Sequence, residues 1–189
     1  MTKIIISKIN ETVKNFERLA ASECVNQINQ AALQCIMTIK KGGKILFCGN
    51  GGSASDSAHL SAELVGRYLI NRNPYASVSL SSNLSTLTAI ANDFGFDNIF
   101  SRQIEAIGKK NDVLIAISTS GKSKNILKAI KKAREKKIKV IFLNSIKNKS
   151  KNKFSDIEIK VPSLRVDRIQ EMHILIGHII CELIEKKIK

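Results

Sequence analysis

The chain lacks tryptophan altogether, and its 189 residues include only two prolines and 5% aromatic residues. A core of this composition rests on Ile, Leu, Val and Ala rather than on large rings. The four cysteines form no C-x-x-C pair, which argues against a thiolate zinc site. The longest apolar run, residues 174–184, contains His178 and Glu182 and is too short to cross a bilayer. We therefore expect a cytoplasmic protein with reduced thiols and no signal peptide or membrane span.

Acidic residues are also scarce, because 16 Asp and Glu stand against 31 Lys and Arg, a net charge of +15. The excess is concentrated between Lys109 and Lys160, where 16 basic residues face 4 acidic ones. An anionic partner such as nucleic acid is one interpretation. A solvated helix face followed by a lysine-rich loop is the other, and we favour it because no interleaving of aromatic and arginine side chains accompanies the lysines. We expect no nucleic-acid partner, although a basic rim would help to collect phosphorylated substrates.

Apolar spacing predicts strands that alternate with helices. The first forty residues lack Gly and Pro and show helical spacing, which predicts one or two long helices ending at Gly42-Gly43. Short apolar runs predict strands at residues 44–48, 76–80, 112–117, 138–143 and 156–161. Helical segments are expected at residues 53–66, 83–91, 99–107, 123–136 and 167–186.

This alternation predicts an α/β fold, a three-layer sandwich with a central, mainly parallel five-stranded sheet preceded by N-terminal helices. The length favours one domain over residues 1–189, with the helices of residues 1–41 packed on it. In such sheets the ligand lies beyond the carboxyl ends of the strands. Two loops then come into view, residues 49–55 and 118–123.

The first loop reads Gly-Asn-Gly-Gly-Ser-Ala-Ser over residues 49–55, between a predicted strand and a predicted helix. Taken alone it fits a dinucleotide fingerprint. That fingerprint also needs an acidic residue near the end of the second strand, and no Asp or Glu lies between Gly66 and Asn92. Dinucleotide binding is therefore disfavoured.

The second loop, Ser-Thr-Ser-Gly-Lys-Ser over residues 118–123, ends like a P-loop. A P-loop requires an opening glycine where this chain has Ala116, so a nucleoside triphosphatase is disfavoured. Four hydroxyls remain around one glycine at a predicted helix N-terminus, where backbone N–H groups and the helix dipole favour an anion. An ordinary N-cap needs only one of them. We expect a site for a single phosphate monoester.

The three histidines supply the candidates for chemistry. His59 and Glu63 are four residues apart on one predicted helix, a spacing that permits shared metal ligation, a base with its partner, or an ordinary surface pair. Gln170 and His178 are about 12 Å apart along the last helix, and their long side chains would have to lean together to meet at one ion. A buried neutral histidine is the alternative for His178. We assign His173 to structure.

The chain as a whole resembles the phosphoheptose isomerase family of the sugar isomerase (SIS) domain superfamily. The resemblance runs in order through five motifs. They are Asn-Gly-Gly-Ser (50–53), His-Leu-Ser-Ala-Glu-Leu-Val-Gly-Arg-Tyr (59–68), Asn-Asp-Phe-Gly-Phe (92–96), Ser-Thr-Ser-Gly (118–121) and Asp-Arg-Ile-Gln-Glu-Met-His (167–173), followed by His178. The first and fourth motifs are widespread in the superfamily, and the others are specific to this branch.

The resemblance implies isomerisation of sedoheptulose 7-phosphate to D-glycero-D-manno-heptose 7-phosphate through an enediol, with Glu63 and His178 as the acid–base residues. It implies one Zn²⁺ per subunit, held by His59, Glu63, Gln170 and His178. It also implies a homotetramer with active sites between subunits. The implied substrate contacts are Asn50, Gly51, Gly52, Ser53, Glu63, Asn92, Asp93, Ser118, Thr119, Ser120, Ser123, Asp167 and Gln170.

Two segments depart from the family pattern: residues 144–153, where relatives often carry a Gly-rich loop, and residues 163–166. The rival interpretation is a non-catalytic SIS adaptor or sensor, of the kind that associates with the replication initiator or senses phosphosugars. The presence of both histidines together with Glu63 and Gln170 favours the enzyme, because an adaptor has no physical need for these residues.

Overall fold

The computed structural model describes residues 1–188 of the chain. Its elements are α1 (Thr2–Ala20), α2 (Cys24–Lys40), β1 (Ile45–Cys48), α3 (Gly52–Val65), β2 (Ser77–Ser79), α4 (Leu84–Phe94), η1 (Phe96–Asn98), α5 (Ile99–Ile107), β3 (Val113–Ile117), α6 (Lys124–Glu135), β4 (Lys139–Ser145), β5 (Ile157–Val161) and α7 (Val166–Lys187). Every helix and strand expected from the sequence is present, and the N-terminal segment forms two helices rather than one.

The strands form one five-stranded sheet in the order β2-β1-β3-β4-β5. All four neighbouring pairs are parallel, so the predicted sheet is confirmed and is parallel throughout. The chain runs outward from β1 to β2 and then returns to the other side of β1 to form β3. This reversal makes a topological switch point, where open parallel sheets bind their ligands. The loops that follow β1 and β3 are the two loops that the sequence singled out.

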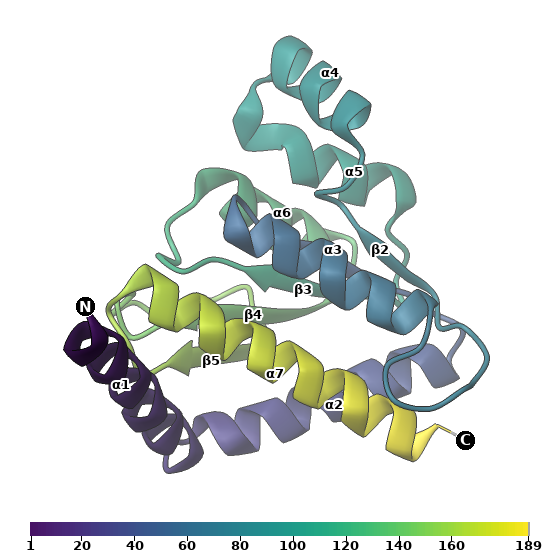
Figure 1. Cartoon of the computed structure of the whole chain (residues 1–189). Coiled ribbons are helices and arrows are strands. Elements are labelled where there is room, and N and C mark those ends of the chain that lie inside the picture. Colours follow the sequence, from purple (N-terminus) through teal and green to yellow (C-terminus); the bar gives the residue numbers. More distant parts are fainter. Residues whose placement is uncertain (189) are drawn as a thin grey trace.

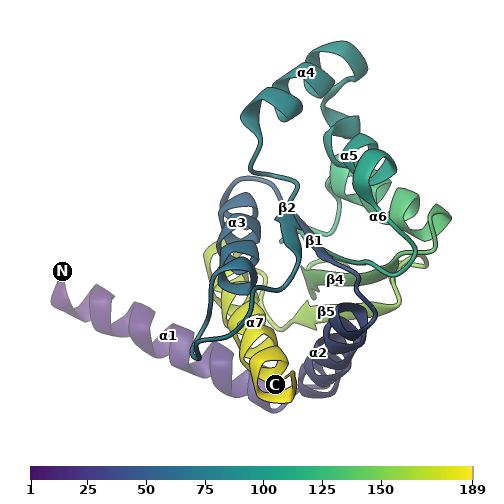
Figure 2. The ribbon, with the colours of Figure 1, turned by 90° about the vertical axis from the view of Figure 1, so that its right-hand side faces the viewer.

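Alternate residues of the strands point to opposite faces and divide the core in two. Ile45 and Phe47 of β1 belong to a cluster with α2, α3 and α7, whereas Leu46 and Cys48 belong to one with α5 and α6. Figures 1 and 2 show these two helical layers on either side of the sheet. The core contains mainly Ile, Leu, Val and Ala, as the composition predicts.

Two helices stand away from this sandwich. α1 projects from the α2 and α7 side in Figure 2, with Ile4, Ile5, Ile6 and Ile9 more than half exposed. α4 is furthest from the sheet in Figure 1, packs on η1 and α5, and buries none of its residues completely. No helix in the described part of the chain is long and apolar enough to cross a membrane.

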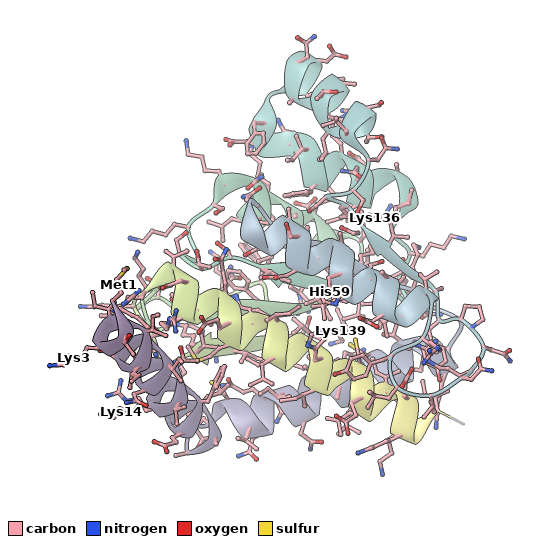
Figure 3. All side chains as sticks on the ribbon, in the orientation of Figure 1. Met1, Lys3, Lys14, His59, Lys136 and Lys139 are labelled. Carbon is pink, nitrogen blue, oxygen red and sulfur yellow. The ribbon has the colours of Figure 1, made fainter. Side chains whose placement is uncertain are left out.

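The basic stretch is spread over the surface of α6 and the loop after β4. α6 buries Ile126, Ala129 and Ile130 and leaves its lysines toward solvent. Near its C-terminal end, Asp156 accepts hydrogen bonds from Arg134 at 3.0 Å and Lys139 at 2.7 Å. Figure 3 shows basic side chains standing out from the ribbon, among them the labelled Lys3 and Lys14 of α1. This arrangement fits the solvated helix face that the sequence favoured.

Candidate active site

The first loop leaves β1 and enters α3 through glycine. Gly51 precedes the helix with φ of 55°, a left-handed conformation that suits glycine. Ser53 lies in the first turn of α3 and is buried. Within residues 1–188 no side chain caps this helix, and the backbone N–H groups of Ser53, Ala54 and Ser55 donate to the carbonyls of Asn50 and Gly51. Such an end is suited to an anion.

The second loop leaves β3 in the same direction and enters α6. Ser118 is buried, and its hydroxyl accepts a hydrogen bond from the backbone N–H of Gly121 at 3.1 Å. Its Oγ also lies 3.3 Å from the Oγ of Ser123, which precedes α6 without capping it. Thr119 and Ser120 are half-exposed at the tip. Four hydroxyls therefore gather around the amino end of α6, which fits the expected phosphate site.

A pair of amides joins the two loops. Asn50 Nδ2 donates to Asn125 Oδ1 at 2.9 Å, and Asn125 Nδ2 donates to Asn50 Oδ1 at 2.8 Å. Asn125 also accepts from the backbone N–H of Ile126 at 2.9 Å. The Asn50 side chain thus links the two loops. No sequence pattern pointed to Asn125, which follows the hydroxyl cluster as an ordinary helix residue.

The lysine-rich loop, which departs from the family pattern, rests on the second loop. Ser145 Oγ donates to the backbone carbonyl of Thr119 at 2.8 Å. Gly121 has φ of 65°, and a Cβ placed there would lie 2.5 Å from Asn148 Nδ2. The loop after β4 is therefore fitted closely to the hydroxyl cluster, even though its sequence is unusual.

His59, Glu63 and His178 come together between α3 and α7. His59 Nε2 lies 3.0 Å from Glu63 Oε1, and the His59 and His178 ring centroids are 5.0 Å apart at an interplanar angle of 72°. One ligand atom from each of the three residues lies within 4.8 Å of the others. Figure 3 labels His59 on α3, beside α7. Two imidazoles and a carboxylate in this arrangement suit a zinc ion of the catalytic type.

The surroundings of His178 favour its neutral form. Burial lowers the pKa of His178, and the neighbouring His59 lowers it further, whereas Glu63 raises it. The net direction is downward. A neutral imidazole can bind a metal ion or accept a proton, so His178 is prepared for either role near neutral pH.

α3 and α7 run side by side in the same direction, and glycine brings them close. A Cβ on Gly177 would lie 2.3 Å from Leu60 Cδ1, so the leucine fits directly against the α7 backbone. At the start of both helices, a Cβ on Gly52 would lie 2.2 Å from Gln170 Nε2. Gly52 precedes His59 by about 10 Å along the helix. Within one chain, Gln170 therefore lies with the first loop rather than with the three other expected ligands, and its ligation of the metal stays a prediction.

Three other expected substrate contacts are exposed and lie outside this cluster. Asn92 and Asp93 are on α4, where Asn92 Nδ2 donates to Asp93 Oδ1 at 2.8 Å. Asp167 lies in the first turn of α7 and forms an ion pair with Arg165 at 2.6 Å. The hydrogen bond from Arg165 lowers the pKa of Asp167 to about 2. Arg165 also pairs with Glu11 of α1.

His173 is fully buried, as its assignment to structure implies. Its Nε2 lies 3.0 Å from the backbone carbonyl of Asn144, and its Nδ1 has no partner. Burial lowers the pKa of His173 to about 4. Asp56 Oδ2 is a second buried side-chain atom without a hydrogen-bond partner. It lies on α3, one turn before His59. Burial raises the pKa of Asp56, and His59 opposes this effect.

Comparisons with known proteins place this geometry in a family. A family model described as the SIS domain matches residues 7–145. The phosphoheptose isomerase of Rhodospirillum rubrum is 50% identical over 163 residues, which cover 86% of this chain and 87% of that protein. The phosphoheptose isomerase of Akkermansia muciniphila is 43% identical over 188 residues, covering 100% of this chain and 98% of its own.

Comparison with solved structures points to the same family. A phosphoheptose isomerase from Francisella tularensis superposes with a TM-score of 0.90 at 34% identity, and 98% of each chain is covered. Both the sheet and the N-terminal helices therefore have counterparts in a protein of known structure.

Proposed function

The chain belongs to the phosphoheptose isomerase family of SIS domain proteins, and from that premise we propose that it converts sedoheptulose 7-phosphate to D-glycero-D-manno-heptose 7-phosphate, the first step of bacterial heptose biosynthesis. The observation that carries the proposal is the meeting of His59, Glu63 and His178 on the flank of an uncapped, hydroxyl-lined pair of helix ends. The two helix ends suit a phosphate, and the cluster of two histidines and a glutamate suits proton transfer.

The phosphate would bind at the two loops. Ser53, Ser118, Thr119, Ser120 and Ser123 supply hydroxyl donors, and the amino ends of α3 and α6 supply backbone N–H groups and the positive ends of their dipoles. Asn50, Gly51, Gly52, Gln170 and Asp167 would contact the sugar from the same region. Asn92 and Asp93 lie on the projecting α4 and would reach substrate bound beside another subunit of the proposed homotetramer.

The proton transfers would be divided between two residues. Glu63 would remove the proton from carbon 1 of the ketose, and His178 would transfer the second proton, at carbon 2 or its oxygen. Each step of this kind contributes about 10²- to 10⁴-fold to the rate. The lowered pKa of His178 keeps it neutral and able to accept a proton near pH 7.

The same side chains fit a divalent ion. His59, Glu63 and His178 would hold zinc, and Gln170 is the fourth ligand that the family resemblance implies. When bound, the ion would act as a Lewis acid toward the substrate oxygens.

The four cysteines are free and buried, which supports the cytoplasmic location that we propose. We also propose that residues 1–189 form one SIS domain, with residues 1–41 at the subunit interface, where the exposed isoleucines of α1 would be covered.

A non-catalytic adaptor or phosphosugar sensor is not favoured, because the curated relatives described above are isomerases by name. A coupled assay with sedoheptulose 7-phosphate separates the two. The zinc-supplied wild type should turn substrate over, and Glu63→Gln should lose about 10²-fold or more with its folding intact. Glu105→Gln, on α5 and 61% exposed, serves as the control and should keep its activity. Turnover by Glu63→Gln close to wild type would contradict the role of Glu63, and no turnover by the wild type, together with binding to the replication initiator, would favour the adaptor.

A further inference from the structure

Tyr68 lies against the imidazole of His178. The two rings are stacked, with centroids 5.4 Å apart and an interplanar angle of 19°. His59 meets the same imidazole edge-on. Among residues 1–188, no protein group donates a hydrogen bond to the His178 ring nitrogens or accepts one from them. Ring contacts therefore take the place of the hydrogen bond that usually fixes an acid–base histidine.

The segment that carries Tyr68 is fastened to α7 by one buried carboxylate. Glu185 accepts hydrogen bonds from the backbone N–H groups of Tyr68 at 2.8 Å, Leu69 at 2.8 Å and Ile70 at 3.2 Å. Its side chain is only 2% exposed. Glu185 and His178 are seven residues apart, so they lie on the same face of α7, two turns from each other. The helix that presents His178 therefore also holds the ring that covers it.

Arg72 connects this arrangement to α3. Its Nε donates to Glu185 Oε1 at 2.8 Å, and Nη2 donates to the backbone carbonyl of Glu63 at 2.8 Å. Nη1 donates to the carbonyl of Leu64 at 2.9 Å. The Arg72–Glu185 pair, the clamp, thus holds the turn that presents Glu63 and the segment that presents Tyr68.

We propose that Tyr68 is a positioning residue for His178: its ring holds the imidazole toward Glu63 and His59, and the clamp holds Tyr68 in place. The inference rests on the proposed function, because it assigns to Tyr68 the orientation of a residue that would transfer a proton. Orientation matters at this level, since a displacement of about 1 Å at a reacting group can cost about 10²-fold in rate.

Two substitutions separate the ring from the hydroxyl. Tyr68→Leu removes the stacked ring, and we expect kcat with sedoheptulose 7-phosphate to fall about 10- to 100-fold while KM changes by less than about threefold. Tyr68→Phe keeps the ring and should rescue kcat to within about twofold of the wild type. Tyr68→Met, of similar length, replaces the leucine variant if that variant does not fold. A leucine variant with normal kcat, or a phenylalanine variant as impaired as the leucine one, would overturn the proposal.

A spectroscopic measurement tests the stacking without any turnover. The chain has three histidines, so ¹³C-labelled histidine gives a spectrum simple enough to assign. The ring protons of His178 should show an upfield ring-current shift that Tyr68→Phe retains and Tyr68→Leu loses, while those of the distant, buried His173 stay unchanged. If the wild type proves inactive on the heptulose, the proposed function fails, and this shift alone decides whether Tyr68 orients the imidazole. The same His178 shift in the leucine variant and the wild type would overturn the positioning role.

Discussion

Replacing Glu185 by glutamine should destabilise the protein far more than replacing Glu182, one turn earlier on the same helix. Glu185 is paired with Arg72 at 2.8 Å, and the two side chains are 2% and 6% exposed. Glu182 is paired with Lys186 at 2.5 Å, with side chains 37% and 66% exposed. Both substitutions remove one negative charge from α7. Only the first leaves a buried guanidinium and three backbone N–H groups facing an amide in place of a carboxylate.

The magnitude follows from burial. Breaking a buried ion pair on one side costs about 3–5 kcal/mol, because the remaining charge stays out of water. An exposed i, i+4 pair contributes about 0.3–0.5 kcal/mol. For a chain of this size, each kcal/mol shifts the melting temperature by about 2–4 °C. Glu185→Gln should therefore melt about 6–20 °C lower than the wild type, and Glu182→Gln within about 2 °C of it.

The measurement is thermal unfolding followed by circular dichroism at one fixed protein concentration, because association of subunits would make the melting temperature depend on concentration. Equal shifts in the two variants would refute the reasoning, since burial is the property that distinguishes the two glutamates.

The stabilising contribution of Glu185 should also depend on pH. Burial raises the pKa of Glu185, but hydrogen bonds from Leu69, Tyr68, Ile70 and Arg72 outweigh it and hold this pKa below its ordinary value. Its stabilising contribution is present above the unfolded-state pKa and is lost as pH falls through the folded-state one, so the gap to Glu185→Gln should narrow below about pH 4.

Two further predictions concern His173 and Gly121. Burial lowers the pKa of His173 to about 4, so below pH 6.5 the unfolded chain binds a proton at this histidine that the folded chain does not bind. The free energy of unfolding should therefore fall by about 3 kcal/mol between pH 6.5 and 4. Urea titrations of His173→Gln should lack this contribution to the pH dependence. Gly121→Ala puts a side chain at φ of 65°, 2.5 Å from Asn148 Nδ2, and should raise KM for the phosphosugar about 5- to 10-fold, a loss of about 1 kcal/mol. An unchanged KM would mean that the second loop does not hold the phosphate.

Much of the fold could be predicted because it depends on local pattern. Short apolar runs between turn residues marked all five strands, and the Gly-rich and Ser-rich loops marked the carboxyl edge of the sheet. The order of the strands could not be predicted in the same way, because pairing depends on contacts between distant segments. α4 illustrates this limit, since its apolar spacing predicted a helix but not its position away from the sheet.

Parts of the site that depend on distant contacts carried no signal in the sequence. Glu185 meets the backbone of residues 68–70, more than a hundred positions away, and no motif joins them. Asn50 and Asn125 pair across 75 positions, and each resembles an ordinary loop or helix residue when considered alone. Gln170 was visible through its resemblance to the family. Its amide lies beside Gly52, however, because the parallel run of α3 and α7 sets that register.

The contact of Leu60 with Gly177 has a consequence for how the site can vary. Gly177 immediately precedes His178, and Leu60 immediately follows His59. The separation between the two imidazoles is therefore set by how closely two helices approach, and that approach depends on a missing methyl group. A core substitution that moves α3 away from α7 by a fraction of an ångström would leave the chain folded but lower its turnover rate. Turnover is thus a more sensitive measure of packing between these helices than the melting temperature is.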